Sequence, residues 1–122
     1  MQAQEKINYV EFGSTNLAAT RAFFEQAFGW AFTPYGPEYL AFAAAEAGLD
    51  GGFFQSDRSS SARSGAALVV LYSRELEACL LRVQACGGRI EQPIFDFPGG
   101  RRFHFVEPGG NELAVWGDAV QG

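Results

Sequence analysis

RFHFVEPGGNELAVW, at residues 102–116, is the stretch that decides the fold of this chain. It reads as two strands with alternating side chains, because a Pro-Gly-Gly-Asn turn interrupts an otherwise regular hydrophobic alternation. The sequence also contains an internal repeat. YVEFGS at residues 9–14 can be laid over LVVLYS at residues 68–73, and the apolar positions that follow keep the same spacing as far as Gly29 and Gly88. The sequence therefore predicts two copies of one unit.

Two long copies are typical of a pair of fused modules rather than of a solenoid, which needs at least three repeats to bury a continuous core. We expect a single domain over residues 1–122, with one module at about 5–55 and the other at about 66–117. The polar segment between them, residues 56–65, has the composition of a linker. Function is expected in the space that the two modules enclose.

Composition narrows the classes of partner. The chain has 122 residues, of which 48% are hydrophobic, enough for one real core. Its net charge of -5 comes from 14 acidic and 9 basic residues without a basic run, so we expect neither nucleic acid nor an anionic membrane as a partner. Neutral or cationic small ligands fit this charge better.

The sequence carries no sign of membrane insertion or secretion. No apolar run approaches the roughly 18 residues that cross a bilayer, and residues 1–6 are polar where a signal peptide would turn apolar. We therefore expect a soluble, cytoplasmic protein. Cys79 and Cys86 lie about 10 Å apart along a predicted helix, too far for a disulfide within it. They are expected to be reduced core thiols, with a reactive thiol as the alternative.

The pattern of apolar residues predicts the order β-α-β-β-β twice. In the first module, a strand at residues 7–13 precedes a helix that ends at Phe28, with Gly29 as its left-handed stop. In the second, a strand at residues 67–72 precedes a helix that ends at Gly87 and Gly88. The remaining strands are expected at residues 31–34, 39–44, 49–55, 89–92, 101–106 and 112–116.

Residues 95–100, FDFPGG, are predicted to form a loop rich in aromatic side chains. Such a loop beside a cavity could serve as a lid or a pocket wall. The alternative is an ordinary turn anchored by two buried phenylalanines.

The paired units, together with FFEQAFGW at residues 23–30 and the EPGGN turn at residues 107–111, resemble the vicinal oxygen chelate superfamily. That superfamily includes glyoxalase I, fosfomycin and bleomycin resistance proteins, extradiol dioxygenases and methylmalonyl-CoA epimerase. The resemblance extends over residues 7–116. It implies an α+β fold in which two tandem βαβββ modules form an open, cup-like mixed sheet around a ligand, with the helices outside.

The resemblance also implies where a metal would be held, because metal-binding members place ligands in the first and last strand of each module. Carried over by register, those positions are Tyr9, residues 51–53, Leu68 and Ala114. None is a histidine or carboxylate, the donors that divalent metals take in this fold. We therefore predict neither a metal nor another cofactor. An unorthodox site built from Glu11, His104 and Glu112 is the alternative.

Two polar residues are the candidates for chemistry in the cup. Glu11 shares a strand face with Tyr9, where a carboxylate is costly unless it is paired, solvated or used. It could bind a cationic ligand or act as a base. Alternatively, it could be solvated by water in the cup, or it could pair with Arg101 or Arg102. His104 is expected beside Ala114, at a position that in fosfomycin resistance proteins looks toward the ligand. It would bond the ligand or transfer a proton, or else be a satisfied interior histidine.

The remaining candidates are mostly aromatic, and each could instead be core filling. The full set of expected ligand-binding residues is Tyr9, Glu11, Leu68, Tyr72, Phe95, His104, Glu112, Ala114 and Trp116.

Taken together, these residues favour a binding protein that holds a small, partly hydrophobic molecule without a metal. The alternatives are a metal-dependent lyase, epimerase or dioxygenase of the same superfamily, and a metal-free acid-base enzyme that uses Glu11 and His104. We also expect a homodimer, because one small chain encloses the cup incompletely and leaves apolar strand edges to be covered. The modules could pair within one chain or be exchanged between two.

Overall fold

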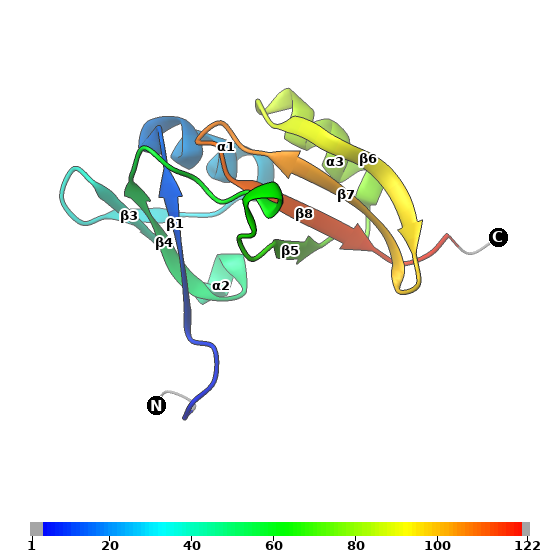
Figure 1. Ribbon diagram of the computed structural model, residues 1–122, viewed down its shortest axis with the longest axis horizontal. Helices are drawn as coiled ribbons and strands as arrows, with labels where there is room; N and C mark the ends of the chain where they lie inside the picture. Colours follow the sequence, from blue (N-terminus) through cyan, green and yellow to red (C-terminus); the bar gives the residue numbers. More distant parts are fainter. Residues whose placement is uncertain (1–3, 121–122) are drawn as a thin grey trace.

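The protein consists of two four-stranded mixed sheets with helices packed against them, as a computed structural model describing residues 4–120 shows (Figure 1). In the first sheet the strand order is β1-β4-β3-β2, and in the second it is β5-β8-β7-β6. The strands of the first sheet are β1 (Tyr9–Ser14), β2 (Phe32–Pro34), β3 (Tyr39–Phe42) and β4 (Asp50–Gln55). Those of the second are β5 (Val69–Tyr72), β6 (Arg89–Phe97), β7 (Gly100–Val106) and β8 (Glu112–Gly117).

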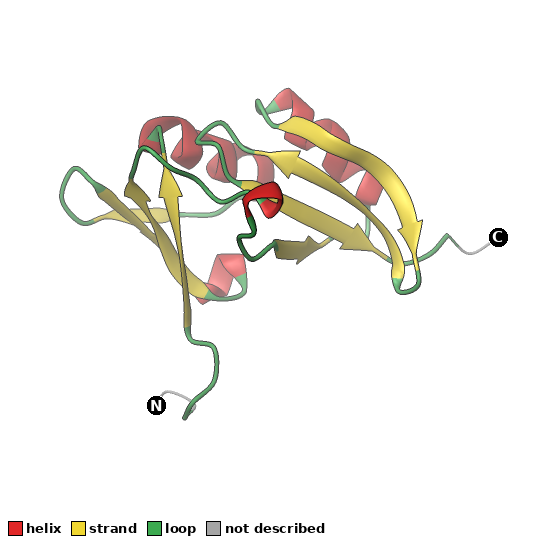
Figure 2. Cartoon of the chain, in the orientation of Figure 1, coloured by secondary structure: helices red, strands yellow, loops and turns green. Residues whose placement is uncertain are grey.

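The two sheets have the same topology, which confirms the expected α+β fold of paired βαβββ units. In each, the first strand runs parallel to the last, and the other neighbours are antiparallel. The first strand also forms an edge of its sheet, so β1 and β5 each pair with only one strand. Figure 2 shows how the helices and the loops connect these strands.

Two longer helices, α1 (Leu17–Phe28) and α3 (Leu76–Ala85), contact each other and lie behind the sheets in Figure 1. Helix α1 begins at Asn16, whose side chain accepts a hydrogen bond from the Ala19 N–H. It ends at Gly29, whose φ of 73° is the left-handed conformation that closes a helix with least strain. The end of the helix therefore lies where the sequence predicts it.

An aromatic core fills the space between the helices and the sheets. The Trp30 ring lies between Phe24 and Phe42, at centroid distances of 4.6 and 4.9 Å. Phe23 of α1 reaches across to Phe105 of β7, with the two ring centroids 5.6 Å apart. One continuous core therefore serves both sheets.

The EPGGN turn between β7 and β8 joins the second sheet to the first. The Thr15 N–H donates to the Gly109 carbonyl at 3.0 Å, and the Asn111 side chain donates to the Gly13 carbonyl at 2.8 Å. Glu107 is 1% exposed and accepts hydrogen bonds from the Thr20 hydroxyl and the Asn111 amide. The turn that stands out in the sequence thus fixes how the two sheets lie relative to each other.

The structure corrects the prediction of a loop at residues 95–100. Strand β6 continues to Phe97 and β7 begins at Gly100, so only Pro98 and Gly99 form the turn. The pairing of β6 with β7 shifts in register between Ile90 and Phe95. Such shifts interrupt the alternation of side chains between the two faces, so the strand is hard to recognise in the sequence. The aromatic side chains that suggested a lid are therefore strand residues.

Three smaller differences concern the ends of elements. A short helix, α2 (Ala44–Ala47), begins where the strand predicted at residues 39–44 was expected to end. Strand β5 begins at Val69, so Leu68 precedes it. A 3-10 turn, η1 (Ala62–Ser64), lies in the predicted linker.

Two observations concern thiols and membranes. Cys79 and Cys86 are both free, and Cys79 is buried. Among residues 4–120, no helix is both long and apolar enough to cross a membrane.

Candidate functional site

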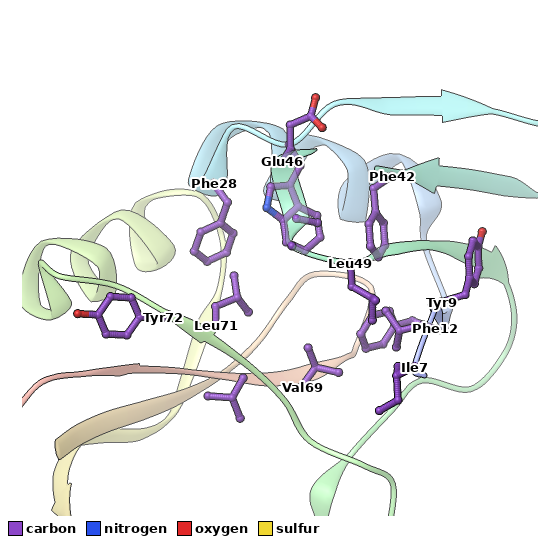
Figure 3. Close-up of a pocket in the computed structure, with 15 residues that line it drawn as sticks. Ile7, Tyr9, Phe12, Phe28, Phe42, Glu46, Leu49, Val69, Leu71 and Tyr72 are labelled. Atoms are coloured by element: carbon purple, nitrogen blue, oxygen red, sulfur yellow. The ribbon is translucent and has the colours of Figure 1, made fainter. Parts of the chain in front are cut away.

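A cavity lies where β1 and β5, each at an edge of its sheet, face each other (Figure 3). Its volume is about 660 Å³, which falls in the range of about 300–1,000 Å³ typical of small-molecule sites. We call it the edge cleft. Its lining residues are Ile7, Tyr9, Val10, Phe12, Phe28, Trp30, Phe42, Glu46, Ala47, Gly48, Leu49, Val69, Val70, Leu71 and Tyr72.

The edge cleft reaches from the surface to the aromatic core. Phe12, Trp30 and Phe42 are all at most 7% exposed and form its inner wall. Val69 and Leu71 of β5 pack against the same core from the opposite side. The inner wall is thus apolar, and it suits the body of a hydrophobic ligand rather than its polar groups.

On the first sheet, Tyr9 and Glu11 lie on the face turned away from α1, as the alternation predicts. We call this face of each sheet the cup face. The Tyr39 hydroxyl, which the sequence analysis did not select, donates to the Glu11 carboxylate at 2.9 Å and also contacts the Tyr9 hydroxyl. Burial, and then its hydrogen bonds to Tyr9 and Glu11, raise the pKa of Tyr39 well above its ordinary value. Tyr39 therefore remains a neutral donor that holds the exposed carboxylate in place.

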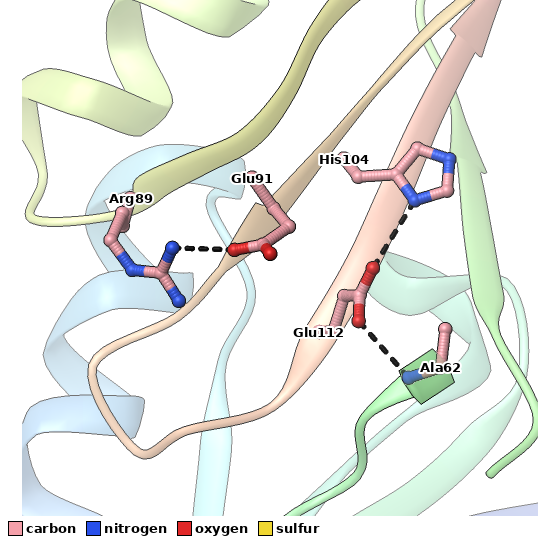
Figure 4. A network of polar contacts seen from close by, with 5 residues as sticks. All are labelled: Ala62, Arg89, Glu91, His104 and Glu112. Carbon is pink, nitrogen blue, oxygen red and sulfur yellow. Dashed lines mark hydrogen bonds and ion pairs between the residues drawn. The ribbon is translucent and has the colours of Figure 1, made fainter. Parts of the chain in front are cut away.

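On the second sheet, the cup face carries a buried polar pair, shown in Figure 4. His104 lies opposite Ala114 in the strand register, as predicted, and is 4% exposed. Its Nδ1 is 3.3 Å from the Glu112 carboxylate, whose other oxygen accepts the Ala62 N–H at 3.0 Å. The His104 Nε2 is buried and has no hydrogen-bond partner among residues 4–120. When Glu112 is ionised and the imidazole is neutral, Nδ1 donates to the carboxylate and Nε2 carries a free lone pair.

The other predicted aromatic residues gather further along the same face. Tyr72 and Trp116 are paired in register and make an edge-to-face contact with centroids 4.8 Å apart. Phe95 packs beside His104, with ring centroids 5.7 Å apart. Arg102, opposite Trp116, stands over the Phe95 ring.

The structure does not bring all of the predicted residues together. Tyr9 and Tyr72 line the edge cleft, whereas Glu11 and His104 lie on different sheets with different partners. The alternative ion pair between Glu11 and an arginine is wrong, because Arg101 pairs with Glu77 and Arg102 contacts aromatic rings.

Sequence reasoning missed the inner wall of the edge cleft, although a signal for it was present. Phe28 and Trp30 belong to the FFEQAFGW segment that carries the family resemblance, but their apolar character favours core packing. Arg102 was missed as a site residue too. The period-two alternation that places His104 on the cup face also places Arg102 there.

The residues do not fit the metal site of the fold family. Leu68 and Ala114 have no donor atom, and the Tyr9 phenol already contacts Tyr39. The alternative set of Glu11, His104 and Glu112 is not gathered into a possible metal site within residues 4–120. Across residues 4–120, no three histidine, cysteine, aspartate or glutamate side chains gather where they could hold a metal ion.

Several solved structures share this fold. A glyoxalase-related enzyme from Fulvimarina pelagi is 19% identical, with a TM-score of 0.73 over 93% of this chain and 88% of that one. The fosfomycin resistance protein FosX from Listeria monocytogenes, in complex with Mn(II) and a dihydroxypropylphosphonic acid, is 15% identical, with a TM-score of 0.76 over 97% and 94%. Lactoylglutathione lyase from Agrobacterium tumefaciens is 18% identical, with a TM-score of 0.68 over 95% and 96%. At these identities the likeness establishes the fold alone.

Comparison with curated proteins gives no match. A family profile, in contrast, matches nearly the whole chain. The profile is described as Glyoxalase/Bleomycin resistance protein/Dioxygenase superfamily, and it matches residues 6–115. That span includes every strand of the first sheet, the linker and most of the second sheet. This chain belongs to the glyoxalase/bleomycin resistance protein/dioxygenase superfamily.

Proposed function

We propose that this protein binds a small, partly hydrophobic organic molecule in the space bounded by its two sheets, and that it does so without a metal ion. The observation that carries the proposal is the edge cleft, a cavity of about 660 Å³ with an aromatic inner wall. Apolar walls with a few placed polar groups are typical of small-molecule sites. Tyr9, Glu46 and Tyr72 are the residues with polar side-chain groups among those that line the edge cleft.

The metal-free part of the proposal rests on donor chemistry. FosX has been crystallised with Mn(II), but at less than 25% identity this bears only on the fold. In this chain the register positions of the family's ligands hold side chains that mostly cannot donate a lone pair. Binding would therefore come from burial of apolar surface and from hydrogen bonds.

A second candidate is metal-free acid-base catalysis, and the His104–Glu112 pair favours it. A histidine whose Nδ1 is held by a carboxylate and whose Nε2 is free has the arrangement of a general base. Its reaction class would be proton abstraction from a bound molecule. For any substrate found, a rate that is lost in His104→Gln but retained in Glu11→Gln would favour this candidate over binding alone.

The proposal can be tested by metal analysis of the purified protein combined with thermal-shift measurements. We expect no stoichiometric transition metal, and no stabilisation by zinc, nickel, manganese or iron. A metal that binds only the native state at 100 times its dissociation constant would add about 2.7 kcal/mol to the free energy of unfolding. About one metal ion per chain, with a clear melting shift, would contradict the metal-free proposal.

The same thermal-shift assay tests binding itself. Neutral aromatic compounds, aromatic cations, and glutathione and CoA conjugates form a suitable panel, because they vary the charge while keeping an apolar body. We expect at least one class to raise the melting temperature in a saturable way. Substituting Trp30 by leucine, a smaller side chain that enlarges the edge cleft, should change the affinity of such a ligand. If no compound class binds, the proposed function fails.

A further inference from the structure

The strands of the second sheet lie side by side in the order β6, β7, β8 and β5 (Figure 1), and one residue of each is paired in register with the next. Phe95 pairs in register with Arg102, Arg102 with Trp116, and Trp116 with Tyr72. Residues directly opposite one another on neighbouring strands share a face, so these four side chains form a continuous strip. Three are aromatic, and the fourth is a permanent cation.

The guanidinium of Arg102 stands over a pair of aromatic rings. Its central carbon lies 5.3 Å from the centroid of Phe95 and 5.5 Å from that of Phe97. Both distances are within the range of a cation–π contact. Phe97 in turn contacts Trp116 edge to face, at a centroid distance of 6.3 Å. The rings therefore hold the guanidinium on this face of the sheet.

Arg102 has no counter-charge of its own. Arg21, Arg89 and Arg101 each pair with a glutamate, but Arg102 makes no ion pair with a carboxylate anywhere in residues 4–120. Its side chain is half-buried, and its Nε is buried without a hydrogen-bond partner in that part of the chain. A buried donor without an acceptor costs free energy, which a partner bearing acceptor oxygens would recover.

A second cavity opens at this position, with a volume of about 250 Å³. It lies between Val70, Phe97, Gly99, Arg102 and Trp116. The volume is below the range of about 300–1,000 Å³ typical of drug-sized ligands, so it suits a body about as large as one aromatic ring. The cavity shares Val70 with the edge cleft.

We propose that this strip, together with Phe97, is a subsite for a single-ring aromatic carboxylate, with Arg102 holding the carboxylate and with Phe97 and Trp116 holding the ring. The guanidinium is planar and presents its N–H groups as a fork, which matches the two oxygens of a carboxylate. Phe97 and Trp116 offer ring faces and edges that favour stacked or edge-to-face contacts. The subsite rests on the proposed function, of which it names the ligand class.

The acidic composition of the chain does not oppose an anionic ligand here. Charges more than about 8 Å away are largely screened at physiological ionic strength, so the local charge decides. Among the acidic groups that adjoin the row, Asp118 accepts a hydrogen bond from the Tyr72 hydroxyl, and Glu112 is paired with His104. Asp96 is opposite Arg101 in the register rather than Arg102.

The test is binding of benzoate, followed by protein-observed nuclear magnetic resonance and by calorimetry, with benzamide as the uncharged analogue. We expect benzoate to shift the Trp116 indole resonance and to bind at least about tenfold more tightly than benzamide. Arg102→Gln should weaken benzoate binding by about tenfold or more and bring it to the level of benzamide. Arg102→Lys, which keeps the charge but not the fork, should fall between the two.

Arg101→Gln is the matched control. It removes the same group one residue away, on the opposite face of β7, where Arg101 pairs with Glu77. We expect this variant to bind benzoate within twofold of the original protein. Melting curves of all variants establish that each is folded before affinities are compared.

Three results would overturn the subsite. The first is benzoate binding that is unchanged in Arg102→Gln, and the second is the absence of benzoate binding. In the third, Arg102→Gln converts a dimer into a monomer and leaves the affinity for benzoate unchanged. That result would mean that Arg102 pairs with a carboxylate of a second copy of the chain rather than with a ligand. If neutral aromatic compounds still bind in the edge cleft, the proposed function stands and only the subsite fails.

Discussion

At the scale of single residues, Glu107 shows how a polar group contributes to the arrangement of the two sheets. Its carboxylate accepts hydrogen bonds from the Gly109 N–H at 2.5 Å, the Asn111 amide at 2.7 Å and the Thr20 hydroxyl at 2.8 Å. Thr20 belongs to α1, so one carboxylate ties the helix of the first module to the turn of the second. Burial nevertheless raises the pKa of Glu107, because it penalises the charged form more than these donors favour it.

The raised pKa of Glu107 predicts a dependence of stability on pH. The native state holds its proton more tightly than the unfolded chain, so the contribution of Glu107 is fully present below the unfolded pKa of about 4.5 and is lost as the pH rises through the raised native pKa. Denaturant unfolding at a series of pH values should show this decline. Glu107→Gln should flatten the curve over this window, whereas Glu38→Gln, at an exposed position, should leave it unchanged.

Glu11 and His104 are the residues for which a role in binding can be separated from a role in folding. If each orients the ligand, Glu11→Gln and His104→Ala should each weaken binding by about 5- to 150-fold, the equivalent of losing a hydrogen bond to a buried partner. Calorimetric titration with a compound found in the thermal-shift panel measures this effect, and Glu38→Gln again serves as the control.

The opposite pattern would indicate structural roles for Glu11 and His104. In that case the melting temperature would fall, while the affinity of the folded fraction would stay within twofold. His104 is the more sensitive of the two to this distinction, because it is buried against Glu112 and Glu11 is exposed.

At the scale of elements, β4 carries two adjacent glycines for two different packing reasons. A Cβ on Gly51 would lie 2.3 Å from the Val10 carbonyl oxygen and 2.5 Å from the Phe42 ring. A Cβ on Gly52 would lie 2.3 Å from the Tyr39 hydroxyl, on the other face of the strand. The missing side chains thus let Phe42 close the inner wall of the edge cleft and let Tyr39 reach Glu11.

Gly51→Ala should therefore be destabilising, since neither a backbone carbonyl nor a buried ring can move away cheaply. We expect a loss of about 3 kcal/mol in the free energy of unfolding, at the upper end of the usual cost of overpacking. Gly29→Ala is a useful comparison, because its φ of 73° imposes strain but nothing lies within 4 Å of the added carbon. It should cost about 1 kcal/mol. Equal losses in denaturant titrations would contradict the packing argument for β4.

At the scale of the whole molecule, the two edge strands β1 and β5 present apolar side chains to the surface. Tyr9, Val70 and Tyr72 are 46%, 42% and 48% exposed. Unpaired edges of this kind are usually protected or covered, and the symmetric dimer is the commonest soluble oligomer that could cover them. We therefore expect the interface of the predicted homodimer to lie at these two edge strands.

Light scattering at micromolar concentration should give about twice the chain mass of 13.2 kDa. Val70→Arg should shift the protein toward the monomer, because it places a charge on the exposed edge. Leu81→Arg makes the same change on α3, at a side chain that is 65% exposed, and should not alter the mass. A monomeric mass at every concentration in a dilution series would refute the dimer.

The sequence by itself determined the repeat, the α+β fold and the face on which most candidate residues lie. Local periodicity placed Glu11 on one strand face with Tyr9, and Gly29 marked the end of the first long helix. The position of His104 beside Ala114 came from the family resemblance instead. The loop predicted at residues 95–100 was wrong, because register shifts between Ile90 and Phe95 interrupt the alternation of β6 before it resumes at Phe95.

Only the tertiary structure decided which of these residues meet. Faces are local properties, but the separation of Glu11 from His104, the pairing of His104 with Glu112 and the aromatic contacts of Arg102 depend on how the strands are ordered and how the two sheets are joined. The same holds for the edge cleft, whose wall combines β1, β5 and the core residues Trp30 and Phe42. The physical reason is that long-range packing, not local propensity, sets distances between residues far apart in the chain.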